Sequence, residues 1–281
     1  MTRGLRTTMN RNVATDFSYA APADGTDARA LLSPATMHPK SLLDLPSGEA
    51  RESLLAVHGI LGAVLPPGNL AIYEAGGGST SFLPLSVLNR AHVTVVDIDE
   101  DQVRNNTYAD KTILGDIQSY RFRPKTFDLV ICYNVIEHLA DVEAALHGFC
   151  QSLKQGGLIL IGAPNPKSLS GVVTRYSPHW FHVWFYRHVR GDKNAGLPGQ
   201  APFPTFFHPL VSLPKLEAFA KAHGLQVIYK KEYESPRFPE MRARKPALAS
   251  LLDAFAAVAN LFVSDKADVR RGDYHIILRK R

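Results

Sequence analysis

The 281-residue sequence is poor in cysteine and has no long hydrophobic run. Its two cysteines, Cys132 and Cys150, lack Cys-x-x-Cys spacing, which argues against a disulfide framework and a cysteine-based zinc site. No stretch reaches the roughly 20 apolar residues that a membrane-spanning helix needs. The first residues, MTRGLRTTMNRN, lack the apolar core of a secretory signal. We therefore expect a cytoplasmic protein without a transmembrane segment.

The composition favours a folded, basic protein. Hydrophobic residues make up 45% of the chain and charged residues 21%, which is enough apolar material for a sizeable core. The formal net charge of +6 permits anionic partners such as nucleic acid, lipid headgroups or acidic substrates, but it requires none of them. The length suits one α/β domain with appendages, or two small domains.

Hydrophobic patterning predicts alternating strands and helices after an extended arm at 1–46, which has a short helical piece at Ser41–Leu45. Near-continuous apolar strands between helices indicate a parallel sheet covered on both faces. We expect one domain at 47–281, with insertions at about 165–213 and 235–270. The expected strands are 70–75, 92–99, 112–116, 127–134, 158–165, 225–234 and 274–281, and the expected helices are 47–64, 79–89, 100–106, 141–154, 177–189, 214–223 and 245–263.

A glycine-rich turn follows the first expected strand, in the stretch IYEAGGGST at 72–80. In a doubly wound sheet, a ligand lies across such a turn at the carboxyl ends of the strands. A nicotinamide-binding fingerprint that starts at Gly76 requires glycine at position 81, where this chain has Ser81. Glu74 precedes the turn and suits a ligand that carries positive charge, such as S-adenosylmethionine, better than a pyrophosphate.

Two further acidic residues end the next strands. Asp97 follows Gly76 at the distance typical of a carboxylate that accepts hydrogen bonds from ribose hydroxyls. Asp116 ends the short third strand, where it can accept from an adenine amino group while Ile117 packs on the ring. Each signal is weak alone, but their order and spacing together favour S-adenosylmethionine as the cofactor.

The glycine turn, Asp97, Asp116 and the fourth strand with its NVIEHL together resemble the class I S-adenosylmethionine-dependent methyltransferases. Within that family, the sequence is most similar to the small-molecule branch that includes the ubiquinone and menaquinone biosynthesis enzymes. The resemblance covers about 70–165. It implies a Rossmann-like, doubly wound sheet of seven strands with an antiparallel last strand. Thr80 stands where the family pattern has a third glycine. The implied cofactor-binding residues are Glu74, Gly76, Gly77, Gly78, Asp97, Ile98, Asp116, Ile117 and Asn134, with the glycines around the methionine portion, Glu74 near its amino group and Asn134 near the methionine end.

The candidate catalytic residues follow strands four and five. His138 is a candidate general base, because an unperturbed imidazole titrates near neutral pH. An equally good interpretation is a structural role, in which His138 stands at a helix start and forms local hydrogen bonds. His182 and Tyr186 lie in SPHWFHVWFYRHV at 177–189, whose aromatic residues at helical spacing cover most of the circumference. We expect this helix to be enclosed and to form a wall of the acceptor pocket. No carboxylate accompanies its histidines at ligand spacing, so we expect no metal site.

The expected function is S-adenosylmethionine-dependent transfer of a methyl group to the oxygen of a small molecule, with carbon and nitrogen acceptors left open. The basic charge favours a nucleic-acid methyltransferase as an alternative, but YNVIEH is not the Asn/Asp-Pro-Pro-aromatic element of base-amino methyltransferases. A non-catalytic protein that binds S-adenosylmethionine is the other alternative. The helix at 245–263 is expected to be a lid, a dimer face or a peripheral lipid contact, in a monomer or homodimer.

Overall fold

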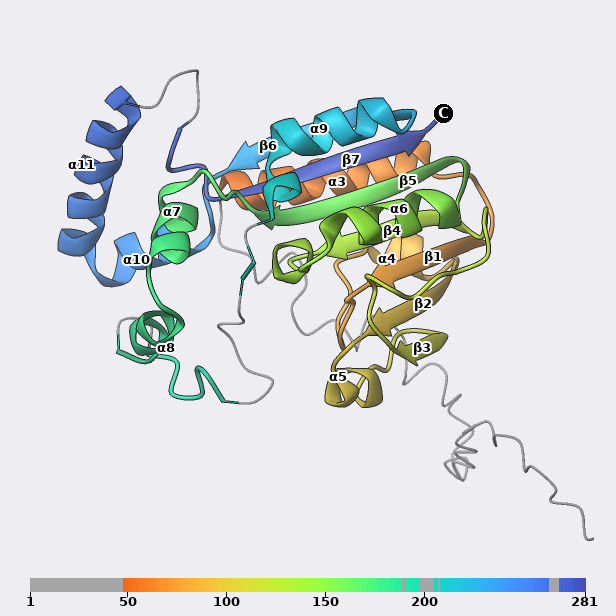
Figure 1. Ribbon diagram of the computed structural model, residues 1–281, viewed down its shortest axis with the longest axis horizontal. Helices are drawn as coiled ribbons and strands as arrows, with labels where there is room; N and C mark the ends of the chain where they lie inside the picture. The colour runs from red at the N-terminus through yellow and green to blue at the C-terminus, as the bar shows by residue number, and fades with distance from the viewer. Residues whose placement is uncertain (1–47, 189–190, 198–204, 207, 263–267) are drawn as a thin grey trace, which may run out of the picture.

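The computed structural model describes residues 48–188, 191–197, 205–206, 208–262 and 268–281. The expected arm at 1–46, with its helical piece at Ser41–Leu45, lies outside the described residues, as does the expected helix cap Ser47. The described chain is built around one sheet with helices on both faces (Figure 1).

A seven-stranded sheet in the order β3-β2-β1-β4-β5-β7-β6 forms the centre of the molecule. The first five strands pair in parallel, whereas β7 is antiparallel to both of its neighbours. The predicted doubly wound sheet with an antiparallel last strand is therefore confirmed. Its strands are β1 (Leu70–Ala75), β2 (Ala91–Asp97), β3 (Lys111–Leu114), β4 (Phe127–Tyr133), β5 (Leu153–Pro164), β6 (Leu225–Tyr233) and β7 (Asp273–Lys280).

Two hydrophobic cores lie on opposite faces of this sheet, because successive strand residues point to opposite sides. In β4, Val130 belongs to one core and Leu129 to the other. The first core includes buried side chains of α6 (Val142–Ser152) and α9 (Leu213–Ala222), and the second those of α3 (Glu49–Val64) and α4 (Leu85–Leu88). Burial on both faces explains why the strands read as continuous apolar runs.

Two predicted helices are shorter than expected. The helix expected at 79–89 is reduced to α4, because it begins only after Pro84, whose extended backbone forms the N-cap. The helix expected at 141–154 ends at Ser152, and β5 begins at the next residue. The short helix α5 (Glu100–Arg104) forms as expected, and the side chain of Asp99 caps its N-terminus.

The remaining helices lie in the two expected insertions. Between β5 and β6 the described chain forms α7 (Leu169–Tyr176), α8 (His179–His188) and the short η3 (Pro209–Val211), and between β6 and β7 it forms α10 (Arg237–Arg244) and α11 (Pro246–Phe262). The helices α7, α8, α10 and α11 stand beyond the carboxyl ends of the parallel strands (Figure 1).

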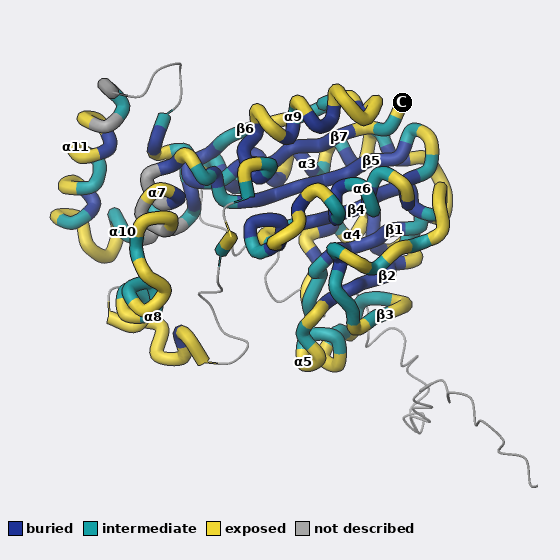
Figure 2. The backbone as a smooth tube through the Cα atoms, in the orientation of Figure 1, coloured by how far each residue is buried: buried dark blue, intermediate teal, exposed yellow. Residues whose placement is uncertain are grey.

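The expected enclosure of the aromatic helix is wrong. No described side chain of α8 is buried, and Trp180 and Trp184 are 68% and 47% exposed. Figure 2 shows α8 largely in the colours of exposed and half-buried residues. Helical periodicity shows which residues share a face, but it does not show whether another element covers that face. Among the described residues, no helix is both long and apolar enough to cross a membrane.

Candidate cofactor site

The turn after β1 requires glycine because of its backbone and its close neighbours. Gly76 and Gly78 have φ values of 68° and 54°, in the left-handed region that favours glycine. A Cβ atom on Gly76 would lie 2.6 Å from both Cγ atoms of Val135. A Cβ atom on Gly77 would lie 2.9 Å from the Tyr108 hydroxyl oxygen. The glycines thus let the loop pack directly against the chain that follows β4.

Side chains of neighbouring elements hold this loop in place. The Gly78 N–H donates to Oδ2 of Asp97 over 2.9 Å, and the Ser79 N–H donates to Oε1 of Gln102 over 3.1 Å. The amide of Asn106 donates to the Gly78 carbonyl over 2.6 Å. Asp97 also accepts from the Asp99 N–H through its other oxygen over 2.9 Å. The loop is therefore preorganised, and Asp97 sits against it at the end of β2.

Glu74 is a buried carboxyl at the base of the loop. Its Oε1 accepts a hydrogen bond of 2.5 Å from the Ser81 hydroxyl, and its Oε2 accepts one of 3.1 Å from Tyr108. Burial raises the pKa of Glu74 to about 7, although both hydrogen bonds oppose this shift. A cationic group beside this carboxyl would favour its ionised form.

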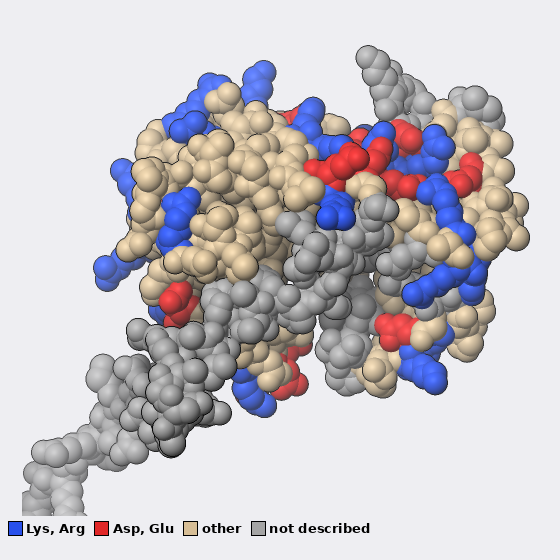
Figure 3. Space-filling model, turned by 180° about the vertical axis from the view of Figure 1, so that it is seen from behind, with Lys and Arg blue, Asp and Glu red and all other residues tan. Residues whose placement is uncertain are grey.

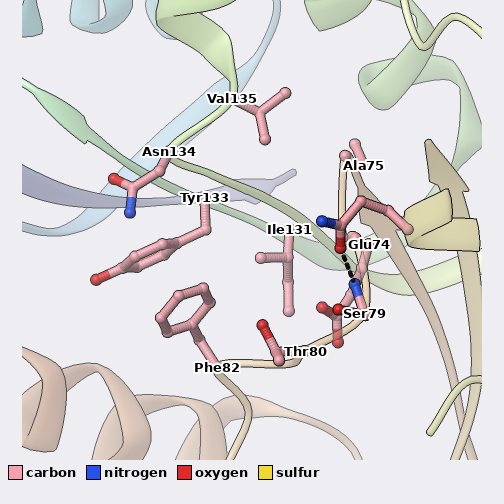
Figure 4. A pocket seen from close by; sticks show the side chains of 13 residues that line it. Glu74, Ala75, Ser79, Thr80, Phe82, Ile131, Tyr133, Asn134 and Val135 are labelled. Atoms are coloured by element: carbon pink, nitrogen blue, oxygen red, sulfur yellow. Dashed lines mark hydrogen bonds between the residues drawn. The ribbon is translucent and has the colours of Figure 1, made fainter. Parts of the chain in front are cut away.

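A recess lies between the glycine loop and the end of β4 (Figure 4). Phe82 and Tyr133 form one wall, with stacked rings whose centroids lie 4.2 Å apart. Figure 4 shows Thr80 and Ile131 between this wall and Glu74. The recess combines a carboxyl, loop amides and an aromatic wall. Its lining residues are Glu74, Ala75, Gly76, Gly77, Gly78, Ser79, Thr80, Phe82, Gln102, Ile131, Tyr133, Asn134 and Val135.

The structure brings together five of the nine predicted cofactor residues in this recess, namely Glu74, Gly76, Gly77, Gly78 and Asn134. Asn134 has a φ of 55°, and its N–H donates to the Gly162 carbonyl over 2.7 Å. This strained turn directs the chain after β4 along the recess.

The other four predicted cofactor residues lie outside the lining of the recess. Asp97 lies at the edge of the recess, where it accepts the hydrogen bond from Gly78. Ile98 is 74% exposed, so its side chain offers an apolar surface to an aromatic ring of a ligand. Asp116 accepts from the backbone and side-chain amides of Gln118. Ile117 lies in the hydrophobic core, which leaves Ile98 the better-placed apolar contact for an adenine.

The predicted catalytic residues are not gathered around the recess. His138 ends η2 (Ile136–His138), three residues beyond the recess residue Val135, and its Nε2 lies 3.7 Å from Oε1 of Glu137. His182 lies on α8, where Nε2 contacts the hydroxyl and carbonyl oxygens of Ser177. Neither His182 nor Tyr186 lines the recess, whose aromatic wall is formed by Phe82 and Tyr133.

Sequence reasoning missed Tyr133 and its buried partner. The Tyr133 hydroxyl lies 2.7 Å from Nε2 of His275, a buried residue of β7. The Tyr233 hydroxyl lies 2.9 Å from the same nitrogen, and Ser53 lies 2.8 Å from Nδ1. The position of Tyr133 at the end of a strand that borders a ligand site could have identified it from the sequence. No sequence pattern identifies His275 as its partner. The part of the chain that the structure describes holds no group of three or more His, Cys, Asp or Glu residues suited to a metal ion.

Residues 73–161, about a third of the chain, match the family model described as a methyltransferase domain. This segment contains the glycine loop, Asp97, Asp116 and the end of β4. The chain contains a class I S-adenosylmethionine-dependent methyltransferase domain. The protein is therefore a methyltransferase enzyme whose cofactor is S-adenosylmethionine. No curated protein matches the chain.

Solved structures share the fold of this methyltransferase at low sequence identity. The (4+2)-cyclase SpnF is 14% identical with a TM-score of 0.50, over 84% of this chain and 85% of its own. Phosphoethanolamine N-methyltransferase 2 from Haemonchus contortus, in complex with phosphomonomethylethanolamine and S-adenosylhomocysteine, is 17% identical with a TM-score of 0.50. That match covers 82% of this chain and 52% of the nematode chain. At such identities the likeness shows the fold alone.

The residues present fit the cofactor. A loop that admits no Cβ at Gly76, a buried carboxyl at Glu74 and a carboxylate at Asp97 provide surfaces for an amino acid, an ammonium and a ribose. An ionised Glu74 beside the loop would oppose the negative charge of a pyrophosphate. This donor set suits S-adenosylmethionine better than a dinucleotide.

Proposed function

We propose that this methyltransferase acts on a small-molecule acceptor and that the methylated atom is an oxygen. The observation that carries the proposal is the aromatic wall of Phe82 and Tyr133 beside the glycine loop. Two stacked rings at the edge of a recess offer a flat apolar surface for a compact, ring-containing or apolar acceptor. None of the described residues that line the recess has a basic side chain that would pair with a nucleic-acid phosphate.

S-adenosylmethionine supplies a methyl group that is already activated by its sulfonium. The protein's task is then to align the acceptor and to keep water out of the site. We assign the cofactor to the loop of Gly76, Gly77 and Gly78, with Glu74 toward the ammonium and Asp97 toward the ribose. Asp116, Ile98 and Asn134 complete the proposed cofactor set, whereas Ile117 belongs to the hydrophobic core.

A hydroxyl acceptor must also lose its proton, which requires a base or a path to water. We propose His138 as that base, since it follows the recess residue Val135 along η2 and lies beside the carboxylate of Glu137. His182 and Tyr186 remain candidates for orienting an acceptor, but only if α8 moves toward the recess.

The test is methyl transfer from labelled S-adenosylmethionine to three matched panels of acceptors, namely phenols and alcohols, amines, and activated carbon acids, with a short RNA and a DNA duplex as further substrates. Labelled product from the hydroxyl panel alone supports the proposal. Product from amines or carbon acids contradicts oxygen as the methylated atom, and product from nucleic acid contradicts a small-molecule acceptor. Calorimetry with S-adenosylmethionine in parallel shows whether a negative panel reflects loss of cofactor binding or the wrong acceptor.

A further inference from the structure

Helix α8 carries an aromatic stripe that no described element covers. Trp180, Trp184 and His188 follow one another at four-residue spacing, so they share one face of the helix. The rings of Trp184 and His188 stack with centroids 5.5 Å apart, and all three side chains are exposed. Tyr176, at the end of α7, is 79% exposed. Large aromatic side chains in such an array rarely stay in water unless they serve an interaction.

Residues beside this stripe hold α8 to the neighbouring turn. A Cβ atom on Gly196 would lie 2.8 Å from a Cγ atom of Val183, so the Val183 side chain packs directly on the Gly196 backbone. The Arg187 Nε donates to the Ala195 carbonyl over 2.9 Å, which fixes the end of the helix to the same turn. Phe181, Val183 and Phe185 are half-buried, whereas Trp180, Trp184 and His188 are exposed, so the stripe is the open side of the helix.

The charge around this stripe is one-sided. Between 169 and 197 the sequence contains a single acidic residue, Asp192, and several basic ones, including Arg175, Arg187 and Lys193. Figure 3 shows both basic and acidic side chains on this appended half of the molecule, at the right of the view, so the basic excess is a feature of the segment 169–197. Tryptophan and tyrosine rings favour the interfacial region of a bilayer, and nearby cationic residues are attracted to anionic headgroups.

We propose that α7 and α8 form a docking surface for an anionic membrane, with Trp180, Trp184 and Tyr176 inserted at headgroup level and Arg175 beside the lipid phosphates. The docked helices lie beyond the carboxyl ends of the parallel strands, which is the edge of the sheet that holds the recess (Figure 1). Docking would therefore bring the methyltransferase recess close to amphiphilic molecules in the membrane. The proposal does not depend on the identity of the acceptor.

The full chain offers a direct reporter, because Trp180 and Trp184 are its only two tryptophans. Their selectively excited fluorescence should shift to shorter wavelength when vesicles of phosphatidylcholine with about 30% phosphatidylserine are added, and brominated lipid should quench it. Vesicles of phosphatidylcholine alone should give a much weaker response. Emission that is unchanged by anionic vesicles would overturn the proposal.

Variants separate the two contributions in a vesicle co-sedimentation assay. The double variant Trp180→Ala/Trp184→Ala should lower the partition coefficient about tenfold or more, because it removes most of the inserted apolar area. Arg175→Gln should lower it about fivefold, and less in high salt. Leu55→Ser, at an exposed leucine on α3, is the matched control and should bind like wild type. A dimer in light scattering whose tryptophan emission responds to dilution but not to vesicles would show that a second copy covers the stripe.

Discussion

The Nε2 atom of His275 lies 2.7 Å from the hydroxyl oxygen of Tyr133, so an aromatic wall of the recess is held from inside the protein. The Nδ1 atom of the same imidazole lies 2.8 Å from the Ser53 hydroxyl on α3. One buried histidine therefore links α3, β7 and the end of β4. Because the ring is surrounded by neutral hydroxyl groups and protein, it is stable in its uncharged form.

Burial lowers the pKa of His275 to about 3, and the charge of His58 acts in the same direction. The folded pKa lies below the unfolded value of about 6.5, so the unfolded chain binds the proton first as pH falls. The resulting stability is present above pH 6.5 and is lost as pH falls toward 3. We expect this group alone to cost about 2 kcal/mol of unfolding free energy at pH 5 relative to neutral pH.

Thermal or urea melts between pH 5 and 7.5 check this prediction. His275→Gln should be less stable at neutral pH, because the partnered hydroxyls lose an acceptor, but its stability should fall less steeply with acid. Tyr233→Phe is the control, since it removes one bond to the same nitrogen and leaves the imidazole titratable. Identical acid slopes in wild type and His275→Gln would contradict the assignment.

The glycine loop gives a second prediction. Gly76→Ala should abolish measurable S-adenosylmethionine binding, because it adds both a strained positive φ and a clash with Val135. Gly78→Ala shares the backbone strain, but its Cβ would meet only Oε1 of Gln102, at 3.1 Å. We therefore expect a smaller loss for Gly78→Ala in calorimetry, and partial rescue of Gly76→Ala by Val135→Ala. Equal losses at both positions, with no rescue, would show that the contact with Val135 does not matter.

Cofactor affinity should also depend on Asp97. Asp97→Ala removes a charged acceptor from the proposed ribose site and from the Gly78 N–H, and each such bond is worth about 1.5–3 kcal/mol. The dissociation constant should rise about tenfold to a hundredfold. Asp110→Ala is the matched control, because Asp110 accepts from the Val93 N–H over 2.7 Å and belongs to no proposed site. If both variants bind S-adenosylmethionine like wild type, Asp97 does not hold the ribose.

The sequence predicted the sheet and the loop because their signals are local. Apolar runs, the turn glycines and the acidic strand ends each lie within one short segment. The partnership of Tyr133 with His275 joins residues 142 positions apart, so it arises only once β7 has inserted beside β5. The contact of Gly76 with Val135 depends in the same way on the pairing of β1 with β4.

The aromatic helix α8 was predicted as a helix, but its expected enclosure is wrong. Apolar and aromatic residues of the segment 177–189 cover most of the circumference of the helix. This pattern is equally compatible with a buried helix and with an exposed helix that binds a partner. The exposure of Trp180 follows from the way the chain leaves β5, and no local pattern encodes that path.

The proposed base gives a prediction about rate. If His138 removes the acceptor proton, His138→Ala should lower the single-turnover rate about 10²-fold to 10⁴-fold and leave cofactor affinity nearly unchanged. His147→Ala is the matched control, since His147 lies 3.8 Å from Glu143 much as His138 lies 3.7 Å from Glu137. A rate for His138→Ala within a few-fold of the control would eliminate it as the base and leave positioning as the source of catalysis.

The last prediction concerns the proton on Glu74. Burial raises its folded pKa to about 7, above the usual 4.5, so the cofactor-free protein holds this proton below neutral pH. A carboxyl that faces the cofactor's ammonium must ionise on binding. Affinity should therefore fall as pH drops through 7, by about eightfold between pH 7.5 and 6.

S-adenosylhomocysteine is the probe for this measurement, because it keeps the ammonium and cannot transfer a methyl group. Calorimetry at pH 6.5 in two buffers of different ionisation enthalpy should detect proton release in wild type and none in Glu74→Gln. The same variant should be more stable than wild type at pH 8, by up to about 3 kcal/mol, because the charged form of a carboxyl with a raised pKa destabilises the fold there. Its amide still offers polar partners to Ser81 and Tyr108, which limits the loss of packing. A stabilised Glu74→Gln variant that binds the probe as tightly as wild type, with the same proton release, would show that Glu74 supports the loop and does not contact the ammonium.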